Sequence, residues 1–305
     1  MTAVSAKPGN VKRTGSLRIT RVFKSKRGAR SMGGNIALAL ALIGMAVIFL
    51  LPIIFMVNNA FKPLYEIMRI PPTILVRNPT MENFHALSNF FNNTLVPIER
   101  YIFNTGFIVA LGVFGQVLFG SMAAYPLAKF DFFGEKFLSS LIVIALMFSP
   151  VVTAVPNYLI LSYLGLVDTY FAVILPSFGT TLGLFLMRNF MTQVPNSLIE
   201  AANIDGAGDF KTLWAVVMPA VKPAWITLFI FSFQAMWGLT GAQVIYTENL
   251  KPLPAALNQI ATTVSIARMG EVMVVSLLMF LVPLVIFMIV QSQVMETMTT
   301  SGMKE

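Results

Sequence analysis

Long runs without a charged residue constrain the fold of this chain more than any other feature of its sequence. Charged residues make up only 11% of the 305 residues and hydrophobic residues 56%, whereas a soluble domain carries about 25% charge. A helix crosses the hydrocarbon core of a bilayer with about 20 mostly apolar residues, and six runs are long enough. We therefore predict an all-α, polytopic membrane protein with six transmembrane helices. They lie within residues 36–57, 101–128, 137–167, 169–187, 223–247 and 272–295.

The distribution of basic residues indicates which side the ends of the chain face. Nine of the 21 Lys and Arg lie in the first thirty positions, with no acidic residue among them. Such a tail before an apolar span stays in the cytoplasm and contacts anionic membrane lipid, so we expect no nucleic-acid partner. An N-in, C-in arrangement puts 15 basic residues in cytoplasmic segments and six outside. We predict a basic cytoplasmic tail (1–33), one transmembrane domain (34–295) and a cytoplasmic C-terminal tail (296–305).

Ionisable residues are absent from all six predicted spans. Proton- and ion-coupled carriers keep such groups inside the bundle, and an intramembrane hydrolase needs paired carboxylates, a metal, or a nucleophile with its base. The chain also lacks cysteine and a G-x-x-x-x-G-K-[ST] phosphate loop, and its one histidine is His85. We predict no catalytic residue, metal site or cofactor in this chain. Uphill transport would draw its energy from another polypeptide, and a passive channel or secondary carrier is the alternative.

The polar side chains that remain in the spans are uncharged. Asn157 and Tyr158 in the third span, and Gln234 and Trp237 in the fifth, are the candidates for a solute route. Gln234 and Trp237 lie three residues apart and share a helix face. Amides and hydroxyls can bond to sugar hydroxyls, but hydrogen bonding between helices is the other interpretation of the same residue types. The remaining neutral polar residues are Asn104, Thr105, Gln116, Ser121, Tyr125, Ser149, Thr153, Ser177, Thr180, Thr181 and Ser232.

The segment between the fourth and fifth spans carries helix start and stop signals. Pro195 ends the incoming chain, and Asn196 or Ser197 is placed to cap a helix over residues 198–205. Gly206 stands where the residue after a helix adopts a positive φ angle. We therefore predict a short helix that ends in a tight turn.

A second helix is expected after this turn, with Asp209 placed to cap it. The two helices would form a helix-turn-helix parallel to the membrane. Leu198, Ala201, Ala202 and Asp205 follow the spacing of one helix face. The two alanines keep that face small, so the backbone of another protein can approach closely.

The residues of this segment resemble those of a known family. Glu200-Ala201-Ala202 is followed after three residues by Gly206, and after nine more by Val216-x-Met218-Pro219. This pattern, within residues 189–219, resembles the EAA loop of permease subunits from binding-protein-dependent ABC importers. Shorter stretches, such as Pro156-Asn157-Tyr158, are similar to the shorter of the two permease subunits of maltose-type carbohydrate importers. The similarity extends from about residue 34 to the C-terminus.

The resemblance implies the type I fold of ABC importers and a multi-pass location in the bacterial cell membrane. A family-type assembly contains a second, related permease, two ATPase subunits that hold ATP and Mg, and an extracytoplasmic solute-binding protein. The implied solute is a carbohydrate, with an oligosaccharide as the leading candidate. An ABC importer for a non-sugar solute is the alternative.

The resemblance also assigns roles within the loop. In the family the glutamate and the glycine contact a cleft in the ATPase, and these roles carry over to Glu200 and Gly206, with Ala201, Ala202 and Asp205 beside them. Glu200 also lies near a helix N-terminus, where the helix dipole favours a carboxylate. The chain departs from the family at Phe233-Gln234, where Trp-Asn is frequent. That difference affects the expected solute contacts and not the coupling loop.

The absence of a phosphate loop gives a direct prediction. We expect the purified chain to hydrolyse no ATP and to bind no nucleotide at micromolar concentration, because it has no site for the phosphates. Hydrolysis is expected only after co-expression with an ATPase subunit. Equilibrium binding of a fluorescent ATP analogue to the isolated chain is the measurement, and saturable micromolar binding would contradict the prediction.

Overall fold

The structure, a computed structural model, describes residues 32–92, 96–262 and 268–301. All regular elements in these ranges are helical, which confirms the all-α prediction. The chain divides into two compact units, residues 1–52 and 53–305, and each is described by itself. The predicted basic tail lies outside the described residues except for its last two positions. The predicted C-terminal tail is described only to Ser301, where it continues the last helix.

The first unit contributes most of α1 (Met32–Ala60), which ends in the second unit. Residues Gly33–Ala60 have a mean hydropathy of 2.9 over their most apolar stretch, and none of that stretch is buried. Pro52 lies inside the helix. The length and composition fit a membrane span, as the sequence predicts.

The second unit contains the remaining helices. We call residues 195–220, the predicted helix-turn-helix, the hairpin. The helices before it are α2 (Leu64–Ile67), α3 (Glu82–Asn92), α4 (Ile98–Lys129), α5 (Glu135–Ala145), α6 (Pro150–Tyr163), α7 (Phe171–Phe178) and α8 (Thr181–Thr192). From the hairpin onward they are α9 (Asn196–Ile204), α10 (Asp209–Thr212), a π-helical turn (Leu213–Val217), α11 (Met218–Ala220), α12 (Lys222–Trp237), a 3₁₀ turn (Glu248–Leu250), α13 (Leu253–Thr262) and α14 (Met269–Ser301).

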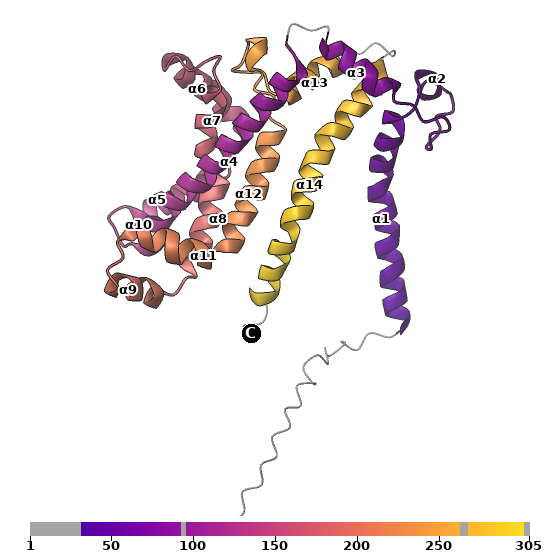
Figure 1. Ribbon diagram of the computed structural model, residues 1–305. Helices are drawn as coiled ribbons and strands as arrows, with labels where there is room; N and C mark the ends of the chain where they lie inside the picture. Colours follow the sequence, from indigo (N-terminus) through magenta and orange to yellow (C-terminus); the bar gives the residue numbers. More distant parts are fainter. Residues whose placement is uncertain (1–31, 93–95, 263–267, 302–305) are drawn as a thin grey trace, which may run out of the picture. The chain divides into compact units, whose positions relative to one another are not determined.

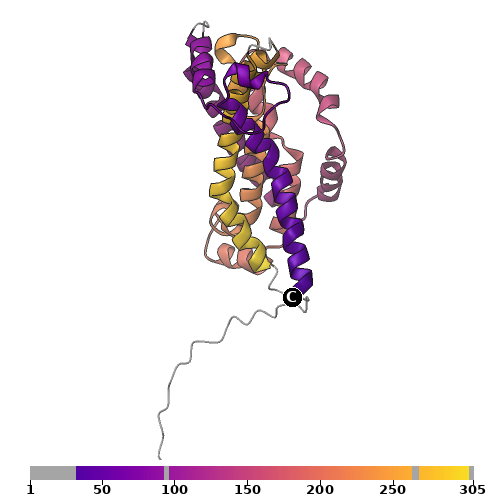
Figure 2. The same cartoon turned by 90° about the vertical axis from the view of Figure 1, so that its right-hand side faces the viewer.

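Helix α4 is the centre of this unit, and it packs against α7, α8 and α12 (Figures 1 and 2). Two glycines let these helices approach. A Cβ atom on Gly112 would lie 2.4 Å from the Met236 side chain, and one on Gly115 would lie 2.0 Å from the Phe178 ring. Small residues at helix contacts are typical of membrane bundles, where close packing holds the spans together.

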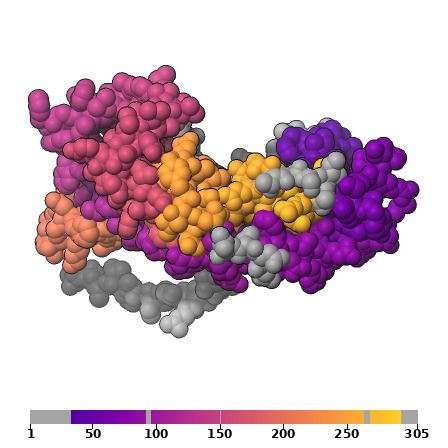
Figure 3. Space-filling view, turned by 90° about the horizontal axis from the view of Figure 1, so that it is seen from above, coloured from indigo at the N-terminus to yellow at the C-terminus, as the bar shows by residue number. Residues whose placement is uncertain are grey.

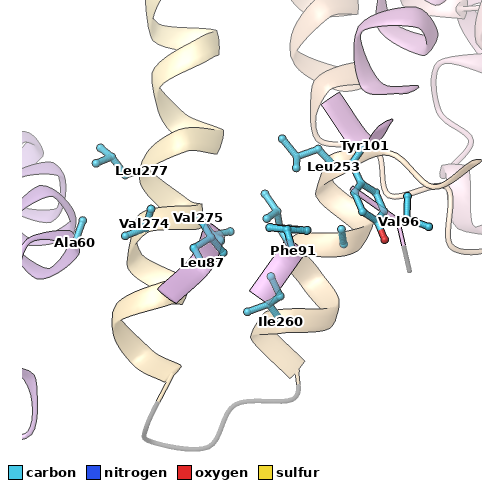
Figure 4. Close-up of a cluster of buried hydrophobic side chains, with 12 residues drawn as sticks. Ala60, Leu87, Phe91, Val96, Tyr101, Leu253, Ile260, Val274, Val275 and Leu277 are labelled. Atoms are coloured by element: carbon cyan, nitrogen blue, oxygen red, sulfur yellow. The ribbon is translucent and has the colours of Figure 1, made fainter. Parts of the chain in front are cut away.

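The second unit has two distinct ends. Helices α9, α10 and α11 gather at one, which we call the hairpin end, and α3, α6 and α13 lie at the other, the loop end (Figure 1). A buried apolar cluster joins α3, α4, α13 and α14 at the loop end, and Phe91, Tyr101 and Ile260 are among its members (Figure 4). A second cluster joins the hairpin to α4, α8 and α12.

The prediction of six spans is not confirmed. Among the described residues four helical stretches are long and apolar enough to cross a membrane: Gly33–Ala60, Ile98–Lys129, Phe171–Thr192 and Met269–Gln291. A fifth is reached only if α12 is counted together with Asp209–Ala220, from which it is bent by 85°. Within the fifth run, 223–247, the helix α12 ends at Trp237 and turns follow.

The predicted third span is broken into α5 and α6. Helix α5 ends at Ala145 and α6 begins at Pro150, where the Ser149 hydroxyl accepts a bond from the Val151 amide at 3.4 Å. Proline lacks an amide hydrogen and fits the first turn of a helix, while the residue before it avoids helical angles. Pro150 therefore starts a new helix here, whereas Pro156 lies within α6.

The segments at the loop end are held by side-chain hydrogen bonds. The Glu66 carboxylate accepts hydrogen bonds from the amides of Arg77 and Asn78, and the buried Lys62 amine donates to the Thr73 carbonyl. Residues 239–262, drawn in orange at this end in Figure 3, include the short helix α13.

Asn104 fixes the 3₁₀ turn and the residues after it to α4. Its buried amide donates to the carbonyls of Asn249 and Lys251, both at 2.9 Å, and accepts from the Tyr170 hydroxyl at 2.7 Å. The neighbouring Thr105 hydroxyl accepts from the Leu253 amide at 2.7 Å. Asn104 and Thr105 are among the uncharged polar residues of the predicted spans, and both side chains stabilise the fold.

Loss of the Asn104 amide should therefore destabilise the loop end. We expect Asn104→Ala to cost about 2–3 kcal/mol, because three hydrogen bonds are lost and two carbonyls are left without a donor. Thermal unfolding of the purified chain, followed by tryptophan fluorescence, is the measurement. Gln234→Ala, at an exposed amide on α12, is the matched control, and equal midpoints for the two variants would refute the assigned role.

Candidate functional site

The hairpin begins at Pro195, which caps α9 through its backbone angles (φ −60°, ψ 134°) and without a side-chain hydrogen bond. The expected capping by Asn196 or Ser197 is therefore wrong, because both are already helical. The proline ring fixes φ just before the first turn and so supplies the stop that a cap would give. The Asn196 side chain instead accepts a hydrogen bond from the Lys129 amine at 3.0 Å.

Helix α9 ends in the turn that the sequence predicts. Gly206 has φ +77°. Its amide donates to the Asn203 carbonyl at 3.0 Å, and the Ala207 amide donates to the Ala202 carbonyl at 2.9 Å. These two bonds form a Schellman motif, which closes the last turn of a helix around a residue in the left-handed region. Glycine is the residue that adopts this region without strain.

The predicted partner face of α9 is only partly open. Glu200, Ala201 and Asp205 are exposed, together with Gly206, but Ala202 is 9% exposed and buried against the rest of the chain. Ala202 lies at the edge of that face, three residues from Ile199, which packs on the apolar cluster of the hairpin end. The inclusion of Ala202 in the accessible face was therefore wrong.

The second arm of the hairpin starts at Gly208, and Asp209 is the first helical residue. The expected capping by Asp209 is wrong, since its side chain makes no capping bond. The π-helical turn follows, with the Met218 amide bonded to the Leu213 carbonyl. Residues five apart come to one face in such a turn, which lets Leu213 and Met218 both be buried in the apolar cluster.

Polar contacts complete the attachment of the hairpin to the bundle. The Lys129 amine, at the end of α4, donates to the Val194 carbonyl as well as to Asn196. Arg188 of α8 pairs with Glu135 of α5 at 2.9 Å and donates to the Leu127 carbonyl of α4 at 3.2 Å, so it joins α8 to the two neighbouring helices. Sequence reasoning missed these contacts, because a cation at the end of a span predicts only which side of the membrane it faces. The Lys129 bond and the apolar cluster connect α9 to α4 and α8.

Two connected hollows lie between the helices. The outer one, about 430 Å³, is lined by Asn157 and Tyr158 of α6 and by polar residues of the 239–244 segment. The inner one, about 400 Å³, lies among α4, α7, α8 and α12. They share Val173, Pro176 and Leu239. The polar residues that line them are Gln116, Thr153, Asn157, Tyr158, Ser177, Thr180, Ser232, Thr240 and Gln243, all of them uncharged.

The two candidates on α12 lie elsewhere. Gln234 is exposed and Trp237 is half-buried, and neither is among the residues that line the two hollows. The Trp237 indole donates to the Met279 carbonyl of α14 at 3.0 Å and stacks on Phe233 with ring centroids 5.7 Å apart. The structure thus brings Asn157 and Tyr158 together at one hollow and separates them from Gln234 and Trp237.

Asp168 holds the segment that forms one wall of the outer hollow. It has φ +63°, and its carboxylate accepts from the amides of Tyr246 and Thr247, both at 2.8 Å, and from the Thr247 hydroxyl. The hydrogen bond from the Thr247 hydroxyl, followed by those from the two amides, lowers the pKa of the Asp168 carboxyl below its ordinary value. The Asp168 amide also donates to the Val244 carbonyl, which lies in that wall.

Comparison with known proteins identifies the family. Residues 116–298 match the family described as "Binding-protein-dependent transport system inner membrane component". The chain belongs to this family. The matched region contains the hairpin and most residues of the two hollows, and the permease assignment made from the EAA pattern is confirmed. The chain is an inner membrane component of such a transport system.

Individual relatives agree with this assignment. The arabinooligosaccharides transport system permease protein AraQ of Bacillus subtilis is 26% identical to this chain. The aligned region covers 88% of this chain and 96% of AraQ. The sn-glycerol-3-phosphate transport system permease protein UgpE of Rhizobium meliloti is 30% identical to this chain. The aligned region covers 70% of this chain and 74% of UgpE.

A solved structure supports the fold. A bacterial ABC transporter involved in the import of the acidic polysaccharide alginate contains a chain that matches 85% of this one, over 95% of its own length, with a TM-score of 0.72 and 22% sequence identity. The permease fold predicted from the resemblance is therefore confirmed.

The Asp168 contacts predict a pH dependence at the loop end. A carboxylate whose folded pKa is lowered adds stability above its ordinary pKa, about 3.9, and this stability is lost as the pH falls through the folded value. We expect wild type to unfold at a higher temperature than Asp168→Asn at pH 6, and the gap to shrink below about pH 4. Thermal unfolding of both proteins between pH 6 and 3 is the measurement, and a gap that does not change with pH would contradict the role of the charge.

Proposed function

We propose that this permease spans the bacterial cell membrane six times, with both ends in the cytoplasm, and imports a carbohydrate with energy from a partner ATPase. The observation that carries the proposal is the hairpin, whose exposed Glu200, Ala201, Asp205 and Gly206 lie on a helix anchored to α4 and α8. The excess of basic residues in the segments on the hairpin side supports the orientation. ATP and Mg would be held by the ATPase, and this chain would hold no cofactor.

The hairpin is suited to transmit movement from an ATPase. Its outer face offers a carboxylate, a small side chain and a tight turn, and its inner face is fixed by Lys129 and by the apolar cluster. Closure of two ATPase subunits around ATP would displace α9, and the contacts to α4 and α8 would pass that displacement to the hollows. The solute would enter from an extracytoplasmic binding protein at the loop end.

A second, related permease would complete the solute route. The two hollows are not fully enclosed by this chain, and uncharged polar groups at membrane depth are tolerated where protein or a water-filled cavity covers them. The uncovered apolar stretch in Gly33–Ala60, with none of it buried, leaves a further surface for such a partner or for lipid. A pair of permeases, two ATPases and a binding protein form the proposed assembly.

The lining of the hollows favours an uncharged solute. Nine polar residues and no charged residue line them, and an unpaired charge buried there would cost several kcal/mol. The relatives include permeases named for a neutral glycan, arabinooligosaccharides, and for a charged solute, sn-glycerol 3-phosphate. We infer a neutral oligosaccharide for this chain because its own hollows lack a cation.

Coupling through the hairpin is tested at its two glycines. Gly206→Val should lower uptake, because a β-branched residue in the left-handed region costs about 1–2 kcal/mol, and Glu200→Lys should lower it by reversing the charge at the contact. Gly208→Val is the matched control, since Gly208 has an ordinary φ of −74° and, like Gly206, open space at its Cβ position. Uptake and co-purification of the ATPase are measured. Values equal to wild type for both Gly206→Val and Glu200→Lys would remove the hairpin from the mechanism.

The solute class is tested by competition. Uptake into proteoliposomes that contain the full assembly should require ATP and should be inhibited by neutral oligosaccharides more strongly than by uronides, amino acids or sugar phosphates. Inhibition by a charged compound alone would show an importer for another solute. Uptake that continues without ATP would favour a passive channel or a secondary carrier.

A further inference from the structure

Ser232 on α12 departs from the way hydroxyls are used in this bundle. Several buried and half-buried hydroxyls in the helices donate to the carbonyl four residues back, as Thr105 does to Tyr101 at 2.9 Å and Ser121 to Val117 at 2.6 Å. Thr227 and Ser276 make the same bond. Ser232 is 3% exposed, and within the described residues its hydroxyl has no hydrogen-bond partner.

An unpartnered hydroxyl is unfavourable inside a bundle. The carbonyl of Leu228, four residues back, is the usual acceptor for a serine at position 232, yet the Ser232 hydroxyl makes no bond to it. Burial of a hydroxyl without a partner destabilises a fold, and an alanine of similar shape would avoid that cost. The unpartnered hydroxyl of Ser232 therefore lowers the stability of the fold, and no contact among the described residues compensates for this loss.

The position of Ser232, in the lining of the inner hollow, indicates a role for its hydroxyl. It lines the inner hollow together with Gln116, which lies on the facing helix α4 and is 6% exposed. Ser177 lines the same hollow, but its hydroxyl already donates to the Ile174 carbonyl at 2.6 Å. Phe231, half of whose surface is exposed, lies in the same lining. The other unpartnered buried atoms, on Tyr125, Thr212, Trp214 and Glu271, belong to residues outside both hollows.

We propose that the inner hollow is a solute subsite in which Ser232 and Gln116 bind hydroxyl groups of an uncharged sugar unit. The inference rests on the proposed importer function and adds the contact residues. A serine hydroxyl both donates and accepts, and a glutamine amide offers two donors and an acceptor, which matches the hydroxyls of a sugar. The Ser232 oxygen is covered in the state described here, and its χ1 angle has two further staggered positions from which it can seek a partner. The Phe231 ring offers an apolar surface to the sugar ring.

The first test needs no solute. Ser232→Ala should raise the thermal midpoint of the full assembly by about 2–4 °C, because an unsatisfied hydroxyl is removed. Ser121→Ala is the matched control. It alters a buried serine whose hydroxyl is bonded at 2.6 Å, and its midpoint should stay the same or fall. A fall in the midpoint for Ser232→Ala would show that the hydroxyl supports the fold, and would overturn the proposal.

The second test measures transport with arabinotriose, diacetylchitobiose and maltotriose, all uncharged, as probes. Ser232→Ala and Gln116→Leu should each lower the maximal rate of ATP-dependent uptake by about three- to tenfold, the effect of one lost hydrogen bond. The affinity of the separate binding protein should not change, and Ser121→Ala should transport at the wild-type rate.

The two tests separate failure of the subsite from failure of the proposed function. Wild-type uptake rates in both variants would overturn the subsite while the importer function stands. Absence of ATP-dependent uptake of every neutral sugar by the wild-type assembly would overturn the proposed function, and the sugar subsite with it. A rise in the thermal midpoint together with a loss of uptake is the result we expect for Ser232→Ala, and a merely structural serine would not give it.

Discussion

The close approach of α4 to its neighbours is the contact on which the second unit depends. Gly112 and Gly115 leave no room for a methyl group against the side chains of Met236 and Phe178, so any larger residue would displace one of these two side chains. Between spans in lipid the hydrophobic effect contributes little, and van der Waals packing at short range holds the helices. The position of α4 therefore decides where α7, α8 and α12 lie, and with them the walls of the inner hollow.

Both ends of α4 are bound to segments outside the helical bundle. Asn104 and Thr105 hold the loop-end segment through backbone carbonyls and an amide, and Lys129 holds the entry to the hairpin. One continuous helix thus connects the hairpin with the region of the outer hollow. In the proposed importer this connection is what lets work done by an ATPase at one end change the opening at the other.

The sequence predicted several elements correctly because their signals are local. Gly206 marks a left-handed turn in sequence and in structure, and four of the charge-free runs correspond to helical stretches of membrane length. The predictions that failed depend on competition between neighbours. Pro195 made a side-chain cap on α9 unnecessary, and Pro150 divided the third run because the residue before a proline resists helical angles. Ala202 was placed on the open face by spacing alone, but it is buried in the structure.

The sequence by itself determined the membrane class, the helical fold, the family and the hairpin, because hydropathy, charge bias and turn chemistry can be read without knowing which helices touch. Only the tertiary structure decided the use of each polar residue in the spans. Asn104, Ser121, Trp237 and Ser232 are equivalent in a sequence, yet the first binds a loop, the second its own helix, the third α14, and the last has no partner. The reason is that a buried polar side chain takes its role from the nearest acceptor in space, and that distance is set by helix packing.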